Sequence, residues 1–426
     1  MHLFFLFKSR IDFYHLCSGF HRLKIKRQKM TSPKDWHSDT KQVRAGLART
    51  ENRETSEALF LNSGYVYDSA EQAAAAFKGE ADNFIYSRYG NPTLQMAEER
   101  LAAIEGAEAC RVCATGMAAI FASMACQLEV GDRVVASQAL FGACHAILTK
   151  ILPRWGIQTE LVDGTDITAW QAALAQPAKL VFMESPSNPV LQLVDIAAVS
   201  ALAHKAGAKV IVDNVFATPI YQSPLELGAD IVTYSTTKHL DGQGRLLGGA
   251  VLADKTFIEE VFQPFYRQTG ASMSAFNAWV LVKSLETLRL RVDAMSAAAG
   301  QLAEKLARHK ATESMQYPGH KSHPQYALAK AQMSGFGSII SVKVRGGRKA
   351  AFTVLNHLKL IDISNNLGDA KTLACHPAST THANLSDRER AALSISESHI
   401  RLSVGLENID DLWCDLCQAL DKIAGD

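Results

Sequence analysis

The stretch that decides the fold is Asp230-Ile231-Val232-Thr233-Tyr234-Ser235-Thr236-Thr237-Lys238-His239-Leu240-Asp241-Gly242. An apolar run of strand character ends in several hydroxyls and one lysine, where a buried strand normally passes into an ordinary turn. A lysine at the mouth of a sheet loses hydration, which lowers its pKa and makes its amine a nucleophile or base. Ser235 and Thr237 add hydroxyl donors that suit a phosphate. The stretch predicts that Lys238 holds an aldehyde cofactor as a Schiff base, with pyridoxal phosphate (PLP) as the candidate; a solvent-facing lysine is the alternative.

A second segment, residues 208–214, favours the cofactor interpretation. It is a nearly continuous aliphatic run that ends in Asp213, as is typical of a parallel strand buried on both faces. Asp213 can bind the protonated pyridine nitrogen of PLP, because opposite charges about 4 Å apart at an effective dielectric of ~20 attract by about 4 kcal/mol. An aspartate that only caps the next helix is the alternative. The combination of Asp213 with Lys238 is what indicates PLP.

Between residues 107 and 253, strand-like runs alternate with helical ones, which predicts an α/β domain with a mostly parallel sheet. The predicted strands are 109–114, 133–137, 179–184, 209–213, 230–235 and 248–252. Several of them end on polar or glycine-rich residues, and ligands of open α/β sheets bind beyond the carboxyl ends of the strands. Thr115-Gly116-Met117 also opens a predicted helix, 115–128, whose first N–H groups suit a phosphate. We therefore expect these strand ends to meet in one pocket.

The N-terminal part of the chain has a different character. Residues 1–29 combine an apolar start with basic residues and a single acid, so we interpret them as a leader or as an over-long gene model with translation starting at Met30. Residues 30–90 are polar and loop-rich, with one predicted helix at 69–77. They are expected to form an arm that packs on something else.

The rest of the chain is predicted to form a large domain over 91–289 and a small C-terminal α+β domain over 290–426. An amphipathic helix that starts at Ala275 is expected to bridge them. Near the end, the alternation His399-Ile400-Arg401-Leu402-Ser403-Val404-Gly405 puts Arg401 on the face opposite its apolar neighbours. Arg401 is a candidate clamp for an amino-acid carboxylate, and an exposed strand arginine is the alternative.

Composition narrows the classes of function. The chain has 426 residues, 47% of them hydrophobic, and 44 basic against 43 acidic side chains give a net charge of +1. This balance argues against nucleic acid or an anionic membrane surface as a partner, and no apolar run approaches the ~20 residues of a membrane span. Eight cysteines in a chain of this length do not indicate a secreted disulfide framework. We expect a cytoplasmic enzyme with small-molecule substrates.

Two other motifs are interpreted as uninformative. The pairs Cys110/Cys113 and Cys414/Cys417 have zinc-like spacing, but they lie some three hundred residues apart in a strand-like and a helix-like run, so no metal is expected. Gly242-Gln243-Gly244 followed by Gly248-Gly249 loosely matches a dinucleotide fingerprint. Its spacing is wrong and no acidic residue follows at the required distance, which disfavours an NAD-dependent oxidoreductase.

Several motifs in the right order resemble the Cys/Met-metabolism family of fold-type I PLP-dependent enzymes. They are Tyr86-Ser87-Arg88-Tyr89-Gly90-Asn91-Pro92-Thr93, Thr115-Gly116-Met117, residues 184–189, Asp213, residues 235–238, His376-Pro377-Ala378-Ser379-Thr380-Thr381-His382, and residues 401–405. The resemblance runs from about Thr40 to the C-terminus. It implies a large, mostly parallel seven-stranded sheet domain, a smaller C-terminal α+β domain and an N-terminal arm.

The resemblance also implies roles for residues. Lys238 would be the Schiff-base lysine, and Asp213 the partner of the pyridine nitrogen. The phosphate would be held by Gly116, Met117, Ser235 and Thr237, joined by Tyr86 and Arg88 from a neighbouring subunit, while Phe141 stacks on the ring and Asn188 lies near the phenolic oxygen. Arg401 and Asn366 would bind substrate. Such sharing implies an active dimer, and the family usually pairs dimers into homotetramers.

Residues 238–245, 364–369 and 56–61 look most like the branch of the family that makes homocysteine. The implied reaction is γ-replacement, which converts O-succinyl-L-homoserine and hydrogen sulfide to L-homocysteine and succinate in methionine biosynthesis. The same machinery serves O-acetylhomoserine sulfhydrylation, cystathionine synthesis and methionine γ-lysis, and a non-catalytic PLP-binding protein is a more distant alternative. Arg245 is a candidate for the cation that binds the succinyl carboxylate.

Phe141 departs from a common family pattern. Many members carry a tyrosine at this position, and phenylalanine can stack but has no hydroxyl. The acid–base steps then fall to Lys238, with Tyr86 as a second catalytic candidate.

Overall fold

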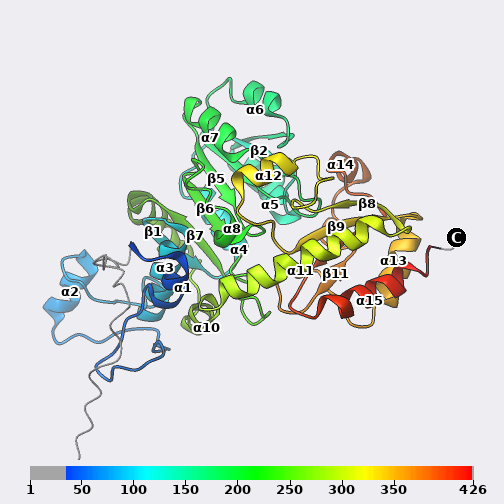
Figure 1. Cartoon of the computed structure of the whole chain (residues 1–426). Coiled ribbons are helices and arrows are strands. Elements are labelled where there is room, and N and C mark those ends of the chain that lie inside the picture. The colour runs from blue at the N-terminus through cyan, green and yellow to red at the C-terminus, as the bar shows by residue number, and fades with distance from the viewer. Residues whose placement is uncertain (1–34, 425–426) are drawn as a thin grey trace, which may run out of the picture. The chain divides into compact units, whose positions relative to one another are not determined.

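The central feature of the molecule is a seven-stranded sheet (Figure 1). The computed structural model describes residues 35–424, and the chain from His37 onward forms one unit by its internal contacts. The predicted leader, 1–29, lies outside the described residues. The strands are β1 Ala109–Cys113, β2 Arg133–Ser137, β3 Gln158–Val162, β4 Leu180–Glu184, β5 Lys209–Asp213, β6 Ile231–Tyr234 and β7 Gly249–Ala253, in the spatial order β1-β7-β6-β5-β4-β2-β3.

The sheet is mostly parallel, as predicted. The pairs β2/β3, β2/β4, β4/β5 and β5/β6 are parallel, whereas β7 runs antiparallel to both β1 and β6. All six predicted strands are confirmed, and the prediction missed β3. This strand lies at the edge of the sheet and exposes Gln158 and Glu160, so it lacks the aliphatic run that marks a buried strand.

Helices cover both faces of this sheet. They are α3 Pro92–Glu105, α4 Gly116–Ala125, α5 Gly142–Ala146, α6 Ile167–Ala173, α7 Ile196–Lys205, α8 Thr218–Tyr221, α9 Gln263–Thr269 and α10 Ala275–Leu285, with π-helical turns at Ile147–Ile151 and Phe257–Phe262 and a 3-10 turn at Leu152–Trp155. Side chains of β6 show the two faces: Val232 belongs to the core under α3 and α10, and Ile231 to the core under α4. This two-sided burial explains the continuous aliphatic runs in the sequence.

The bridging helix expected from Ala275 is two helices. The helix α10 ends at Leu285, and α11, Leu288–Arg308, begins after a short break. The buried guanidinium of Arg291 explains the break, because it donates to the carbonyl oxygens of Ser284 at 2.9 Å and His239 at 2.8 Å. The last turn of α10 is thus capped by a side chain that also contacts the loop after β6.

The C-terminal part contains a second sheet. Its strands are β8 Thr312–Gln316, β9 Ile339–Val344, β10 Asp362–Ile363, β11 Leu373–Cys375 and β12 His399–Ser403, in the order β10-β11-β12-β9-β8, and its helices are α11, α12 Tyr326–Gln332, α13 Gly347–His357, α14 Asp387–Ala392 and α15 Ile409–Leu420, with a 3-10 turn at Pro377–Ser379. Only β10 and β11 pair in parallel. Figure 1 shows α11, α13 and α15 gathered beside this sheet, with which they share one apolar core. The predicted α+β character is confirmed.

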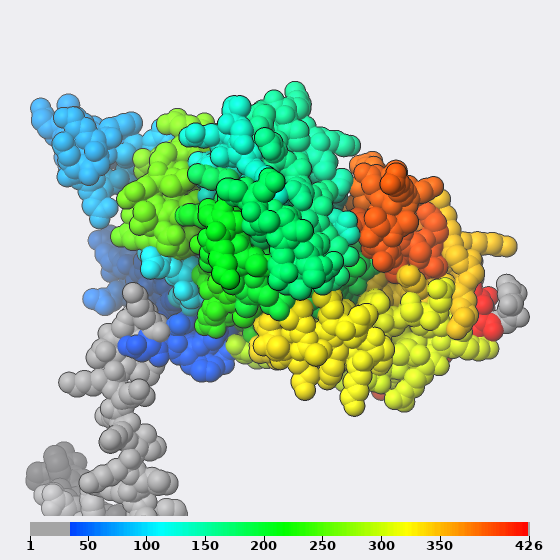
Figure 2. All heavy atoms as spheres, turned by 90° about the horizontal axis from the view of Figure 1, so that it is seen from above, coloured from blue at the N-terminus to red at the C-terminus, as the bar shows by residue number. Residues whose placement is uncertain are grey.

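The C-terminal part also contacts the large sheet region. In Figure 2 the orange segment that contains α14 lies against cyan and green atoms of that region. Ala378, Leu385 and Leu393 of this segment share a small apolar cluster with Ala139 and Val190. The loop that carries Thr381 is thereby held near the strand ends of the large sheet.

The N-terminal arm has two helices, α1 Ser38–Arg44 and α2 Ala70–Lys78, of which only α2 was predicted. Both Figures 1 and 2 show α2 projecting beyond the sheet region. The arm is anchored by Glu57, whose carboxylate pairs with the fully buried Arg100 of α3 at 2.6 Å and with Lys283 of α10 at 3.0 Å. Within residues 35–424, no helix combines the length and apolar character needed to cross a membrane.

Candidate active site

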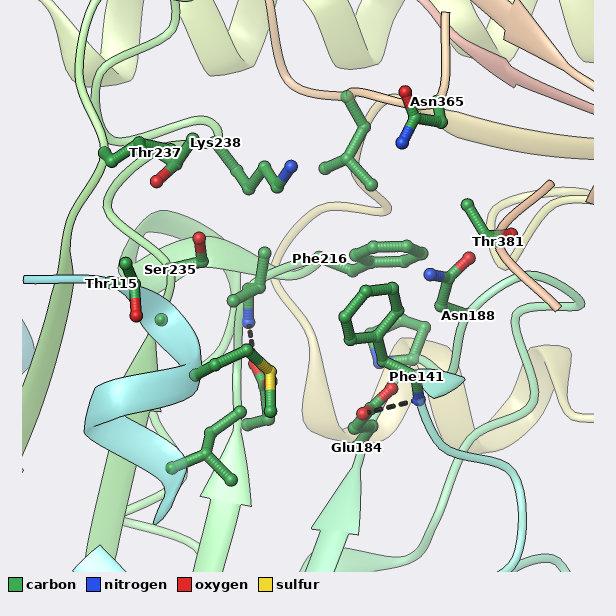
Figure 3. Close-up of a pocket in the computed structure, with 18 of the residues that line it drawn as sticks. Thr115, Phe141, Glu184, Asn188, Phe216, Ser235, Thr237, Lys238, Asn365 and Thr381 are labelled. Carbon is green, nitrogen blue, oxygen red and sulfur yellow. Dashed lines mark hydrogen bonds between the residues drawn. The ribbon is translucent and has the colours of Figure 1, made fainter. Parts of the chain in front are cut away.

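The carboxyl ends of β4, β5 and β6 meet the N-terminus of α4 and loops of the C-terminal part at one pocket of about 250 Å³ (Figure 3). Of the residues predicted for the site, the pocket is lined by Gly116, Met117, Phe141, Asn188, Asp213, Ser235, Thr237, Lys238 and Arg401. These residues come from positions spread over almost 290 residues of sequence. The expectation that the strand ends converge is confirmed, whereas the role of each residue stays a prediction.

Lys238 points its amine into this pocket (Figure 3). Burial and, secondarily, the positive charge of Arg401 lower the pKa of Lys238 to about 8. Its Nζ donates to Oδ1 of Asn366 at 2.5 Å. Lys238 is therefore not a hydrated lysine on a polar loop, and a larger fraction of it is a neutral amine near neutral pH than of an ordinary lysine.

Asp213 ends β5 at the floor of the pocket. Its carboxylate accepts the backbone N–H of Val215 at 3.0 Å. The N-cap position of the following helix α8 is occupied by Ala217, and no side chain of the described residues caps that helix. The capping alternative is thus wrong for this aspartate. Burial raises the pKa of Asp213, and a cation placed against it would reverse that shift.

The N-terminus of α4, with Thr115 as its N-cap residue, packs against Ser235. Thr115 caps the helix, because its hydroxyl accepts the N–H of Ala118 at 3.0 Å. A Cβ added to Gly116 would lie 2.7 Å from Cβ of Ser235, so only glycine allows the helix to approach this closely. The free N–H groups of the first turn, together with Ser235 and Thr237, form a donor set that suits a phosphate.

Arg401 lies in β12 and is 1% exposed, which excludes an exposed strand arginine. Its guanidinium donates to Oδ1 of Asn188 at 3.1 Å and to the carbonyl oxygens of Asn365 at 2.9 Å and Asn366 at 3.1 Å. Among the described residues, its buried Nε has no hydrogen-bond partner. A buried guanidinium that is fixed by three hydrogen bonds and still has, within the described residues, an unpaired N–H donor suits the binding of a carboxylate.

Asn366 was predicted to bind substrate, and the structure places its side chain on Lys238. The neighbouring Asn365 lines the pocket instead. Lining residues that no sequence motif contained include Val215, Phe216 and Leu247, whereas Glu184, Leu367 and Thr381 were noted only as parts of motifs. Thr381 belongs to the motif 376–382, so motif membership was the available signal for it. Val215, Phe216 and Leu247 carry no sequence signal because they look like core residues.

Tyr86 and Arg88 are not among the residues that line the pocket of their own chain. The Arg88 guanidinium lies over the rings of Tyr86 and Tyr89, with its central carbon 5.5 and 4.8 Å from their centroids, and it donates to the carbonyl of Arg267. Tyr86 is 42% exposed. That Tyr86 and Arg88 bind the cofactor phosphate in a neighbouring subunit stays a prediction.

Arg245 also lies outside the pocket lining. Its guanidinium pairs with the buried carboxylate of Asp241 at 2.9 Å and donates to Oγ of Ser284 at 2.6 Å. Arg245 therefore supports the loop after Lys238 and does not line the pocket of its own chain.

The nearby glycines Gly242 and Gly244 have left-handed backbone conformations in the loop between β6 and β7. No helix lies in this described stretch between the two strands to receive a dinucleotide.

The two Cys-x-x-Cys pairs lie in different parts of the fold. Cys110 and Cys113 belong to β1, whereas Cys414 and Cys417 belong to α15. Within residues 35–424, neither group of three potential metal ligands contains cysteines of both pairs.

The residues of the pocket fit PLP. An amine with a lowered pKa faces a buried carboxylate across the cavity, and a helix N-terminus with adjacent hydroxyls supplies donors for the phosphate. The fold and this site define a PLP-dependent enzyme of the α/β class. The chain belongs to the Cys/Met metabolism PLP-dependent enzyme family, whose model matches residues 39–421.

Relatives within the family are similar over nearly the whole chain. An O-succinylhomoserine sulfhydrylase of Mycobacterium tuberculosis is 53% identical, with 89% of this chain and 94% of that protein covered. One of Pseudomonas aeruginosa is 47% identical (90% and 94% covered), and an L-methionine gamma-lyase of Treponema denticola is 41% identical (90% and 96% covered).

A solved structure supports both the fold and the cofactor. A Campylobacter jejuni protein, named as an O-acetylhomoserine (thiol)-lyase, superimposes with a TM-score of 0.87 at 31% identity, over 91% of this chain and 100% of that one. That structure contains N'-pyridoxyl-lysine-5'-monophosphate.

Proposed function

We propose that this protein is an O-succinylhomoserine sulfhydrylase, a PLP-dependent transferase that converts O-succinyl-L-homoserine and hydrogen sulfide to L-homocysteine and succinate. The observation that carries the proposal is the joint presence of the Lys238 amine, the Asp213 carboxylate and the Arg401 guanidinium around one cavity. The similarity to sulfhydrylases at 53% and 47% identity supports the choice of reaction. The product places the enzyme in methionine biosynthesis.

Each of these residues has a distinct task. Arg401 binds the α-carboxylate of the substrate, and its contacts to Asn188 and the 365–366 backbone fix the direction of its N–H groups. Asp213 would hold the ring nitrogen of PLP and would favour its protonated form. PLP, when bound, supplies an electron-withdrawing ring that stabilises negative charge at the carbon next to the amino group.

Lys238 moves the protons. Its amine, with a pKa near 8, removes the proton from Cα of the substrate and returns it later in the reaction. Asn366 accepts a hydrogen bond from the same nitrogen and directs it toward the Arg401 side of the pocket. Phe141 would pack on the cofactor ring, but it has no hydroxyl to take part in proton transfer, and Tyr86 of a neighbouring subunit is the second acid–base candidate.

We propose that the active unit is a dimer and that dimers pair into homotetramers. Tyr86 and Arg88 lie outside the lining of their own pocket, and the arm exposes apolar side chains such as Val66 and Phe77, at 98% and 67%. A second copy that covers the arm would bury these side chains and receive Tyr86 and Arg88 at its phosphate site. The domain boundaries proposed are an arm over 30–90, a large domain over 91–289 and a small domain over 290–426.

We further propose a cytoplasmic location. The seven cysteines in the described part of the chain are all free, which suits a reducing compartment.

Steady-state rates with succinyl- and acetyl-homoserine, each with sulfide or cysteine, test the reaction. The proposal expects the highest kcat/KM for the succinyl ester with sulfide. Faster turnover with cysteine would make the protein a cystathionine synthase, and preference for the acetyl ester an O-acetylhomoserine sulfhydrylase. Release of methanethiol from methionine at a comparable rate would identify the lyase activity named for the 41% identical relative. A PLP-bound protein without any turnover would be a non-catalytic binder.

A further inference from the structure

Glu184 is a second buried carboxyl beside Asp213, and no role has been assigned to it so far. It is the last residue of β4, and the β4/β5 register pairs it with Asp213. Register partners on neighbouring strands share a face of the sheet. Glu184 is 5% exposed, and one carboxylate oxygen each of Glu184 and Asp213 lies, together with Sγ of Cys144, in a group whose members are all within 4.8 Å of one another.

This arrangement opposes ionisation of both acids. Burial and the charge of Asp213 raise the pKa of Glu184, and burial raises the pKa of Asp213. Among residues 35–424, neither carboxylate forms an ion pair within 4.0 Å. Two close acids of this kind are stabilised by a positive charge placed against them.

The carboxyl of Glu184 also makes a contact that a neutral side chain could make. It accepts the backbone N–H of Phe141 at 2.8 Å, and Figure 3 shows this bond beneath the Phe141 ring at the pocket. A glutamine of the same size would accept the same N–H without like-charge repulsion toward Asp213. The charge of Glu184 is therefore not needed for this hydrogen bond, and Glu184 lines the same pocket as Asp213.

We propose that Glu184 is a second acidic residue of the cofactor site, which acts together with Asp213 on the cationic ring end of PLP. The inference rests on the proposed function in so far as PLP occupies this pocket. Its hydrogen bond to the Phe141 backbone places the ring of that residue beside the acidic pair. Glu184 thus positions Phe141 through its hydrogen bond and stabilises the cationic ring end of PLP through its charge. It acts on the cofactor and not on the substrate.

The variant Glu184→Gln separates charge from packing. The apoprotein is expected to have an equal or higher Tm, because glutamine removes the cost of burying a second ionisable acid beside Asp213 while the Phe141 N–H keeps its acceptor. The Kd for PLP, measured by titration of the visible absorbance, is expected to increase about tenfold. The rise in Tm on addition of PLP should shrink accordingly.

Glu98→Gln is the matched control. Glu98 is a partly buried carboxylate that also accepts a backbone N–H, that of Val112 at 3.2 Å, and burial raises its pKa, but it pairs with Arg111 at 3.1 Å and does not line the pocket. Its variant is expected to bind PLP with the Kd of the wild type. A wild-type Kd and a wild-type Tm gain for Glu184→Gln would overturn the proposal. So would a lowered apoprotein Tm with an unchanged Kd, since that result assigns a purely structural role.

An infrared measurement on the wild type does not depend on whether the variant folds. The groups that face the acidic pair are Cys144 of α5 and, across the pocket, Lys238 and Arg401. In the difference spectrum between the PLP-bound protein and the apoprotein, the carbonyl band of a protonated carboxyl should be lost, as the pair ionises against the ring cation. Buried acids away from the pocket, such as Glu105, cancel in this difference. A difference spectrum without such a loss contradicts the inference. A wild type that binds PLP but forms no homocysteine refutes the proposed reaction and leaves this test valid.

Discussion

At the scale of single residues, the chemistry of the pocket depends on burial of charge. Lys238 loses hydration and lies near Arg401, so its pKa falls, while Asp213 and Glu184 share a buried end, so their pKa values rise. The same physical cause, removal of water from an ion, shifts acids and bases in opposite directions. The site is thereby ready for a cofactor that brings an aldehyde to the amine and a cation to the acids.

Replacement of Lys238 by alanine is expected to lower kcat for homocysteine formation by at least 10²–10⁴-fold, roughly the contribution of a positioned acid–base group. Borohydride reduction of the PLP-loaded wild type should label Lys238, as mass spectrometry can check. Lys255→Ala is the control, because the Lys255 side chain is 66% exposed. Turnover of the Lys238→Ala variant at the wild-type rate, or a label on another lysine, would contradict the assignment.

The pKa of Lys238 near 8 predicts how capture of PLP depends on pH. Only the neutral amine attacks an aldehyde, so the rate constant should rise about tenfold per pH unit below pH 8 and level off above it. Stopped-flow absorbance with the apoprotein measures this profile, and the reaction of N-acetyl-lysine methyl amide serves as the unburied reference. If the protein profile continued to rise to the pH range of the reference amine, burial of Lys238 would be ruled out.

At the scale of elements, the pocket depends on where strands end and where helices begin. The helix α4 starts at Gly116 against Ser235. Side chains of α10 and α11 hold the loop after β6, and Gln325 and Gln332 at the start and end of α12 hold the loop after β4. The break between α10 and α11 is an example, since Arg291 joins Ser284 to the loop after Lys238. The buried ion pair of Glu57 with Arg100 fixes the arm in the same way.

Arg100→Ala is expected to lower the free energy of unfolding by about 3–5 kcal/mol, because it leaves the carboxylate of Glu57 buried with only Lys283 as a cationic partner and removes donors from two carbonyls. Urea denaturation measures the change. The control Arg308→Ala removes an exposed pair with Glu304, whose arginine side chain is 83% exposed, and should cost at most about 1 kcal/mol. Equal effects of the two variants would show that the arm is not anchored by this pair.

At the scale of the whole molecule, the site requires more than one chain if the proposed dimer is right. Arg88 and Tyr86 lie on the arm and away from the pocket that their own chain forms. The arm also carries the exposed apolar residues Val66 and Phe77. A shared site couples assembly to activity, because a subunit alone would lack part of its phosphate site.

Mixed assemblies test this sharing. Lys238→Ala and Arg88→Ala proteins should each be nearly inactive, and mixing them after dissociation should restore activity. Random pairing makes half of the dimers mixed, each with one intact site, so about a quarter of wild-type activity is expected. The control is the Lys238→Ala protein alone, taken through the same dissociation and reassociation, in which no intact site can form. No recovery in the mixture, with mixed dimers verified by mass spectrometry, would mean that Arg88 acts within its own chain or not at all.

The local pattern of the chain was enough to predict much of the fold. Aliphatic runs marked six of the seven strands of the large sheet, because strands buried on both faces must be apolar throughout. The polar residues that follow those runs marked Asp213, Ser235 and Lys238, since parallel strands bring their carboxyl ends to one edge. Asn91 and Pro92 marked the start of α3, where the Asn91 side chain accepts the N–H of Thr93 at 2.9 Å.

The sequence by itself thus determined the α/β class, the sheet and the residues at its ligand-binding edge, because these follow from periodicity and from the chemistry of neighbouring residues. Only the tertiary structure decided which distant groups join them: the burial of Arg401 against Asn188, the hydrogen bond of Asn366 to Lys238, and the pairing of Glu184 with Asp213. It also decided the edge strand β3 and the break after α10. The physical reason is that these features arise from contacts between segments far apart in the chain, which leave no periodic signal in the residues that make them.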